Sequence, residues 1–149
     1  MTNTIGISTS FYCHDGRGNW LLHRRSEQCR DERRVWDCGG GKLEFGLSLE
    51  ENVLKEIQEE YCCDAKIQEQ LPAITLLRES PQQMRTHWLI IPFILFIDKA
   101  NQKKVQIGDK EKMEEIGWFT FDMLPQPMHS GFVKTISLYK SRFLKYLPT

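Results

Sequence analysis

The sequence has no excess of charge of either sign. Its 149 residues include 20 Lys and Arg and 20 Asp and Glu, which gives a formal net charge of +0. Proteins that bind nucleic-acid polymers usually carry a basic excess, because phosphate contacts supply much of the attraction. A nucleic-acid polymer is therefore not an expected partner. Hydrophobic residues at 40% and charged residues at 27% lie near the globular average, which argues against a disordered or fibrous chain.

Long apolar runs and a leader pattern are also missing. The most apolar stretch, Trp88 to Ile97, is interrupted by Pro92 and has about half the length of a membrane-spanning helix. Met1 to Ser10 has no basic residue ahead of an apolar run, unlike a signal peptide. These absences disfavour membrane insertion and secretion.

Cysteine spacings typical of zinc or redox motifs are absent. The five cysteines are odd in number, and no two of them are spaced C-x-x-C. They are Cys13, Cys29, Cys38, Cys62 and Cys63. A disulfide framework or zinc ribbon is disfavoured, so we expect a reducing, cytoplasmic location.

Strand patterns are present along most of the chain, and no repeat or linker divides it, so we expect one domain over residues 1–149. Apolar runs bounded by turn residues predict the strands. These are Ile5–Cys13 and Trp20–His23, joined as a hairpin, Ile67–Leu77 and His87–Asp98, separated by a turn around Ser80-Pro81, and Ile116–Phe121. Because His87–Asp98 is apolar almost throughout, we expect it to be central and buried on both faces.

Two segments have helical spacing. Ser48 and Glu51 have the spacing of a capping box, and the apolar residues that follow predict a helix from Ser48 to Tyr61. A stripe of aromatic residues that includes Phe132 and Phe143 predicts a final helix after a proline-rich turn. The order of elements predicts an α/β fold with helices packed on a mixed sheet.

The candidate chemistry lies in three successive glycines, Gly39 to Gly41, and in the helix after them. Glu56, Glu59 and Glu60 share one face of that helix, where like charges repel. Carboxylate clusters suit hard cations such as Mg²⁺ or Mn²⁺ better than zinc. A solvated acidic face is the alternative interpretation, and the neighbouring glycine loop favours the metal site.

This segment resembles the signature of the Nudix hydrolases, G-x5-E-x7-R-E-U-x-E-E-x-G-U, where U is aliphatic. The signature glycine falls on Gly41, and its helix carboxylates fall on Glu56, Glu59 and Glu60. Further similarities to small MutT-like members lie outside this box. They are Arg24-Arg25 at the end of a strand, Trp36 before the glycines, and Trp118-Phe119 leading to Asp122-Met123-Leu124-Pro125.

Three positions depart from the signature. Leu47 replaces its first Glu, Lys55 its Arg, and Cys62 its Gly. Leu47 cannot bind a metal, so weaker or altered metal occupancy is expected. Lys55 can extend to solvent where a buried Arg would need a carboxylate. Cys62 in a left-handed conformation would cost about 1 kcal/mol of stability.

The resemblance implies a Nudix fold, with a mixed sheet sandwiched between helices, and a metal-dependent pyrophosphohydrolase. Glu56, Glu59 and Glu60 would be catalytic and would bind Mg²⁺ or Mn²⁺, together with the Gly40 carbonyl. Arg25, Trp36, Gly40 and Gly41 would contact substrate. A later acid completes such sites, and we choose Glu114 from Glu111, Glu114 and Glu115, for which a solvated loop is the alternative.

The substrate implied is a nucleotide-type small molecule. A nucleoside triphosphate is favoured by elimination, followed by a nucleotide sugar or ADP-ribose. The competing hypothesis is a catalytically silent Nudix-fold module that binds a nucleotide or a protein. The apolar strand from Leu89 to Ile97 would favour a homodimer if it lay at a sheet edge.

Overall fold

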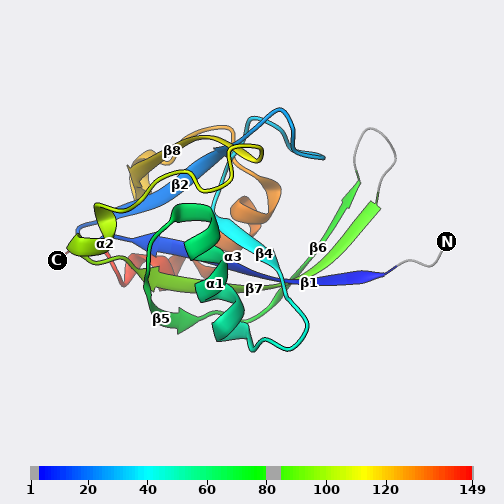
Figure 1. Ribbon diagram of the computed structural model, residues 1–149, viewed down its shortest axis with the longest axis horizontal. Coiled ribbons are helices and arrows are strands. Elements are labelled where there is room, and N and C mark those ends of the chain that lie inside the picture. Colours follow the sequence, from blue (N-terminus) through cyan, green and yellow to red (C-terminus); the bar gives the residue numbers. More distant parts are fainter. Residues whose placement is uncertain (1–3, 80–84, 149) are drawn as a thin grey trace.

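The computed structural model describes residues 4–79 and 85–148, and within them eight strands form one mixed sheet (Figure 1). The strands are β1 (Ile5–His14), β2 (Asn19–Arg25), β3 (Trp36–Asp37), β4 (Gly39–Lys42), β5 (Lys66–Gln70), β6 (Ile74–Glu79), β7 (Arg85–Phe96) and β8 (Met113–Thr120). The helices are α1 (Leu49–Tyr61), α2 (Lys99–Gln102), the 3-10 turn η1 (Phe121–Met123) and α3 (Ser130–Leu144).

Strand β1 organises the sheet. It runs parallel to β7 along its whole length, and antiparallel to β2 near its end and to β4 before that. Strand β2 continues the sheet to β3 and β8, while β7 pairs with β5 and β6. Because β7 has partners on both sides, it is not the free edge at which an apolar strand would favour dimerisation.

The sheet separates two hydrophobic cores, as Figure 1 shows with α1 in front of the sheet and α3 behind it. Val53, Ile57 and Tyr61 of α1 pack on one face. Phe132 and Phe143 of α3 pack on the other, which confirms that the aromatic face of the last helix covers the sheet. The predicted α/β fold, a mixed sheet between helices, is therefore confirmed.

Helix α1 begins and ends as its sequence predicts. The Ser48 side chain accepts the Glu51 amide and the Glu51 side chain accepts the Ser48 amide, so the capping box is formed. The helix ends at Cys62, which has a left-handed φ of 60°. This conformation favours glycine, so Cys62 carries the expected strain.

The predicted strand Ile67–Leu77 is wrong, because two strands, β5 and β6, occupy this region. Pro72 lies between them, where its missing N–H would leave a gap in the hydrogen-bond ladder. Both strands pair with β7, so the chain shifts along β7 without reversing direction. The predicted turn around Ser80-Pro81 lies outside the described residues.

The boundaries of β7 and β8 differ less from the strands predicted from the sequence. Strand β7 is buried on both faces from Ile91 to Leu95, but only partly buried from Thr86 to Ile90. Strand β8 begins at Met113, earlier than the predicted Ile116, and the loop before it contains α2. Within the described ranges, no helix has both the length and the apolar character needed to cross a membrane.

Candidate active site

A cavity of about 870 Å³ surrounds strand β4. In the register between β1 and β4, Gly41 lies opposite Thr9 and Gly40 opposite Ser10. Successive residues of a strand face opposite sides of its sheet, so β4 faces α1 and α3 alternately. Residues from both helices line the cavity, including Glu56 of α1 and Phe132 of α3. The glycine strand therefore lies between two connected parts of one cavity.

Glu60 joins α1 to the glycine strand. The Gly40 amide donates a hydrogen bond to Glu60 Oε2, with an N to O distance of 3.0 Å. Loss of solvent raises the pKa of the Glu60 carboxyl well above its usual value, and the Glu56 carboxylate raises it further. The Gly40 hydrogen bond opposes this rise without cancelling it. Glu60 is thus an acid held in an environment that disfavours its negative charge.

Glu56 lies directly against Gly41. A Cβ atom at Gly41 would be 2.3 Å from Glu56 Cδ and 2.4 and 2.5 Å from the carboxylate oxygens. Only glycine leaves room for this carboxylate. Partial burial and the charge of Glu59 raise the pKa of Glu56. The predicted pair of Glu56 and Glu60 is therefore brought together at the glycine strand.

The Glu59 carboxylate pairs with Lys55 and not with the glycine strand. Its Oε1 lies 2.5 Å from Lys55 Nζ, which also contacts Glu44 Oε1 at 2.9 Å. Lys55 thus links the loop before α1 to the third carboxylate. In the part of the chain that is described, no three His, Cys, Asp or Glu side chains converge as metal ligands. The donor set that fits a hard divalent cation is limited to Glu56 and Glu60 in this arrangement.

The late acid predicted from the sequence does not reach the cavity. Glu114 forms ion pairs with Arg24 at 2.9 Å and with Arg34 at 3.4 Å. Neither Glu111, Glu114 nor Glu115 belongs to the lining, whereas Asp109 and Lys112 do. The choice of Glu114 is thus not supported by its position. The sequence places these acids beside one another, and the pairing of β8 with β2 turns Glu114 toward Arg24.

Of the two predicted substrate contacts Arg25 and Trp36, only Arg25 lines the cavity. Arg25 lines the cavity, where it donates to the carbonyl oxygens of Asp31 and Glu32 and contacts the Asp37 carboxylate at 3.7 Å. Trp36 has only 7% of its surface exposed and packs edge-on against Phe119 in the core beside α3. It does not line the cavity, so its predicted substrate contact is not supported.

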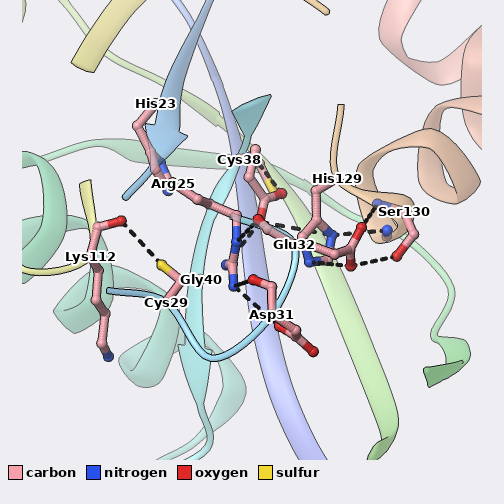
Figure 2. Close-up of polar contacts among 12 residues, drawn as sticks. His23, Arg25, Cys29, Asp31, Glu32, Cys38, Gly40, Lys112, His129 and Ser130 are labelled. Atoms are coloured by element: carbon pink, nitrogen blue, oxygen red, sulfur yellow. Dashed lines mark hydrogen bonds and ion pairs between the residues drawn. The ribbon is translucent and has the colours of Figure 1, made fainter. Parts of the chain in front are cut away.

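A polar network at the α3 end of the cavity has no signal in the sequence (Figure 2). His129 Nδ1 accepts the Gly131 amide at 3.0 Å, and its Nε2 lies 2.9 Å from Glu32 Oε2 and 2.7 Å from Arg78 Nη1. Glu32 also accepts from the Ser130 amide and hydroxyl and contacts Arg78 Nη1 at 2.9 Å. These residues lie far apart in the chain, and only the fold brings them together.

This network controls the ionisation of Glu32. Partial burial alone would raise the pKa of Glu32. Hydrogen bonds from His129, Arg78 and the Ser130 amide outweigh burial and hold the pKa well below its ordinary value. Loop residues 26–34 are consequently fixed to the start of α3 by a charged group.

Asn52 is a second residue that the sequence does not single out. It is fully buried, and its Nδ2 donates to Thr9 Oγ1 at 2.9 Å. Its Oδ1 accepts the Glu44 amide at 3.0 Å. One side chain thus connects α1, β1 and the loop after the glycines. A polar residue on the apolar face of a predicted helix is the signal that would have identified it.

His23 also lines the cavity, at its buried end. Its Nδ1 lies 2.8 Å from the Tyr61 hydroxyl. Burial lowers the pKa of His23 to about 4, although Asp37 opposes this. The imidazole is therefore neutral near pH 7, and we assign it no catalytic role.

The sequence from residue 5 to 139 matches the family model described as the NUDIX domain. The chain belongs to the Nudix family. This assignment agrees with the glycine strand, the acidic helix and the sheet between helices. No curated protein is significantly similar in sequence to this Nudix chain.

Solved structures support the Nudix fold. The MutT NUDIX hydrolase from Burkholderia pseudomallei superposes with a TM-score of 0.74 at 21% identity, covering 91% of this chain and 98% of that one. The MutT protein from Methanosarcina mazei Go1 superposes with a TM-score of 0.71 at 21% identity, covering 97% of this chain and 96% of that one. The NUDIX domain of Shewanella oneidensis NrtR, complexed with ADP ribose, superposes with a TM-score of 0.67 at 17% identity, covering 95% of this chain and 89% of that one.

The departures from the Nudix signature now have structural positions. Lys55, in the place of the signature Arg, forms its ion pairs at the protein surface. Leu47 is partly buried in the loop between β4 and α1 and contributes no charge. The Nudix helix in this chain therefore connects to its loop through Lys55 and Asn52.

Proposed function

We propose that this Nudix protein hydrolyses the pyrophosphate linkage of a nucleoside diphosphate derivative, with Mg²⁺ or Mn²⁺ held by Glu56 and Glu60. The observation that carries the proposal is the pair of carboxylates beside Gly40 and Gly41 in the cavity. Burial raises the pKa of both carboxyls, and no described residue lowers either pKa back to its ordinary value. A divalent cation would supply this missing positive charge.

The chain's own groups support phosphate chemistry. Arg25, Lys42 and Lys112 line the cavity and favour the approach of an anionic substrate. The glycines of β4 carry no side chains that would block close approach of a phosphate. A bound divalent cation would offset charge on phosphate oxygens and make water easier to deprotonate. Glu56, with its raised pKa, is the group best placed to accept the water's proton.

Glu59 and the Gly40 carbonyl complete the proposed set of ligands. Glu59 lies on the same helix face as Glu56 and lines the cavity, but its carboxylate is held by Lys55. The ion pair is exposed, and exposed pairs contribute little energy, so Glu59 can exchange Lys55 for a cation. We propose that it does so when substrate enters.

For the substrate, we propose a nucleoside triphosphate first and a nucleotide sugar or ADP-ribose next. The cavity volume is within the range that accommodates any of these molecules. The test is a panel of all three classes of nucleotide with Mg²⁺ and Mn²⁺, measuring released phosphate or pyrophosphate.

For the location of the protein, we propose the reducing cytoplasm, with which five free cysteines are consistent.

Two variants test the carboxylates directly. Glu56→Gln and Glu60→Gln should abolish turnover of whichever substrate is found. Glu50→Gln is the matched control, because Glu50 lies in the first turn of the same helix but outside the cavity. It should retain full turnover. Retained activity in both cavity variants would refute the proposed roles.

A silent binding module is the second candidate, favoured by the contact between Lys55 and Glu59. In that case the helix carboxylates would be partly neutralised by the chain itself, without a cation. Ligands would then raise the melting temperature in the absence of metal, and no member of the panel would be hydrolysed. This pair of results would select the binding module over the enzyme.

A further inference from the structure

Phe45 lies at the tip of a tight turn between β4 and α1. The Leu47 amide donates to the Glu44 carbonyl oxygen at 3.2 Å, and Gly46 has a φ of 91°. A type II turn needs a positive φ of this kind at its third residue, which favours glycine there. Phe45 is therefore the second residue of the turn. In Figure 1 the turn belongs to the cyan segment that leads from β4 to α1.

The Phe45 side chain is both fully exposed and part of the cavity lining. Its relative exposure is 106%, the highest among the large hydrophobic residues that the structure describes. Single apolar residues are common on protein surfaces, so exposure alone does not mark a binding site. However, of the exposed large hydrophobic residues in the described ranges, Phe45 is the one that lines the cavity. The ring therefore lies at the opening of the cavity, where a ligand would pass it.

The main chain just before Phe45 is held in place by hydrogen bonds. The Leu43 amide donates to the Ile7 carbonyl oxygen at 2.8 Å, and the Glu44 amide donates to Asn52 Oδ1 at 3.0 Å. After the turn, the capping box fixes the start of α1. A side chain on a segment that is already ordered binds a ligand at a lower cost in conformational freedom. Phe45 is thus positioned before a ligand arrives.

The cavity wall continues from the α1 carboxylates to this turn. Glu44 lines the cavity beside Phe45, and Lys55 joins its carboxylate to that of Glu59. Gly41 lies against the α1 carboxylates, and the chain from Gly41 to Phe45 can span at most about 14 Å. This distance is comparable to the length of an extended nucleotide. A substrate whose phosphates lie beside the α1 carboxylates can therefore place its other end on Phe45.

We propose that Phe45 binds the base of the nucleotide by stacking of the two rings. The inference rests on the proposed function, because that function places the phosphates beside the α1 carboxylates. The base is the flat end of a nucleotide, and flat rings of this kind stack on aromatic side chains. Every base has such a face, so the contact strengthens nucleotide binding without selecting among the bases.

The test compares AMP with ribose 5-phosphate, in which a hydroxyl replaces the base. Neither ligand contains a phosphoanhydride bond, so calorimetric titration in the presence of Mg²⁺ measures binding without hydrolysis. Phe45→Ala should weaken the binding of AMP about tenfold and leave that of ribose 5-phosphate unchanged. Phe45→Trp keeps an aromatic ring and should bind AMP at least as tightly as the wild type.

Met123→Ala is the matched control. Met123 is also exposed, at 73%, but it does not line the cavity. Its truncation should leave the affinity for AMP unchanged. Phe45→Ala and Met123→Ala should both keep the melting temperature of the wild type, because neither side chain belongs to a hydrophobic core. A loss of AMP binding in Phe45→Ala is therefore not a loss of folding.

Three results would overturn the proposal. They are an unchanged affinity for AMP in Phe45→Ala, an equal loss of affinity for AMP and ribose 5-phosphate, and failure of AMP to bind to the wild type. If Phe45→Ala instead separates a wild-type dimer and leaves AMP binding unchanged, a second copy covers the ring and the proposal fails.

The hydrolysis panel separates this inference from the proposed function. Weaker AMP binding in Phe45→Ala, without turnover of any nucleotide in the panel, refutes hydrolysis alone. Turnover in the panel, without an effect of Phe45→Ala on AMP binding, refutes the Phe45 contact alone.

Discussion

The backbone amide of Gly40 and the carboxylate of Glu60 are 3.0 Å apart, and this contact joins β4 to the end of α1. A glycine at position 40 lets β4 lie this close to β1, because a Cβ atom there would lie 2.7 Å from the Thr9 carbonyl oxygen. The end of α1 is therefore held by the main chain of the glycine strand. The next glycine in the strand has a different neighbour, and the two glycines should respond differently to substitution.

Gly41→Ala should reduce turnover by about 100-fold or more while leaving the protein folded. The atoms nearest to the new Cβ would be those at the end of the Glu56 side chain, which can move aside and lose its position. Turnover should be measured together with urea unfolding. Gly40→Ala provides the contrast, since its Cβ would strike main chain and should lower the free energy of unfolding by about 1–3 kcal/mol. Equal effects of the two variants on stability would contradict this distinction.

Lys55→Met should lower the Mg²⁺ concentration needed for half-maximal turnover, because it releases Glu59 for the cation. The melting temperature should change by no more than about 2 °C, since both ion pairs of Lys55 are exposed. A magnesium titration of activity provides the measurement. Lys66→Met, at an exposed position on β5, is the control and should leave the titration unchanged. A higher magnesium requirement in Lys55→Met would show that Lys55 helps to organise the site.

Glu32→Gln should destabilise the protein by about 1–3 kcal/mol near neutral pH, because it weakens hydrogen bonds to a charged acceptor. The pKa of Glu32 is lower in the folded than in the unfolded chain. Its charge therefore stabilises the fold above the ordinary pKa of 4.5, and this stabilisation declines as the pH falls below that value. Urea unfolding at about pH 7 and about pH 3 should show the difference from wild type shrinking with acid.

The control for this pH effect is Glu27→Gln in the same loop. Glu27 is exposed, and its one ion pair among the described residues is with Arg34 at 3.5 Å. Its substitution should change stability little at either pH. A constant difference between Glu32→Gln and wild type across this pH range would show that the Glu32 charge is not what anchors the loop.

Asn52→Ala should lower the free energy of unfolding by about 1–3 kcal/mol, since two buried hydrogen bonds are lost and the Glu44 amide is left without its acceptor. Thr9→Val, similar in shape to the native residue, breaks only the bond to Thr9 and should cost less. Chemical denaturation measures both. If Thr9→Val is as costly as Asn52→Ala, the link from Asn52 to the loop contributes nothing.

Local patterns in the sequence are sufficient to predict α1, the first hairpin, and the position of the glycines beside the helix carboxylates. The capping box and the spacing of Glu56 and Glu60 are short-range features, which the fold leaves intact. Glu114 and Trp36 were assigned by position in a motif, but their side-chain directions depend on pairing with β2. The contacts of Glu32, Arg78 and His129 join distant segments, and no local pattern encodes them.

The parallel pairing of β1 with β7 also sets the order in which this chain can fold. Ile5 lies opposite His87 and His14 opposite Phe96, so the partners are separated by more than half of the chain. During synthesis, β1 leaves the ribosome long before its partner exists, and contacts between such distant segments form slowly. The first hairpin and α1 must wait for β7 before either core closes. Nascent chains released before Phe96 should therefore lack stable tertiary structure, even though they already contain every carboxylate of α1.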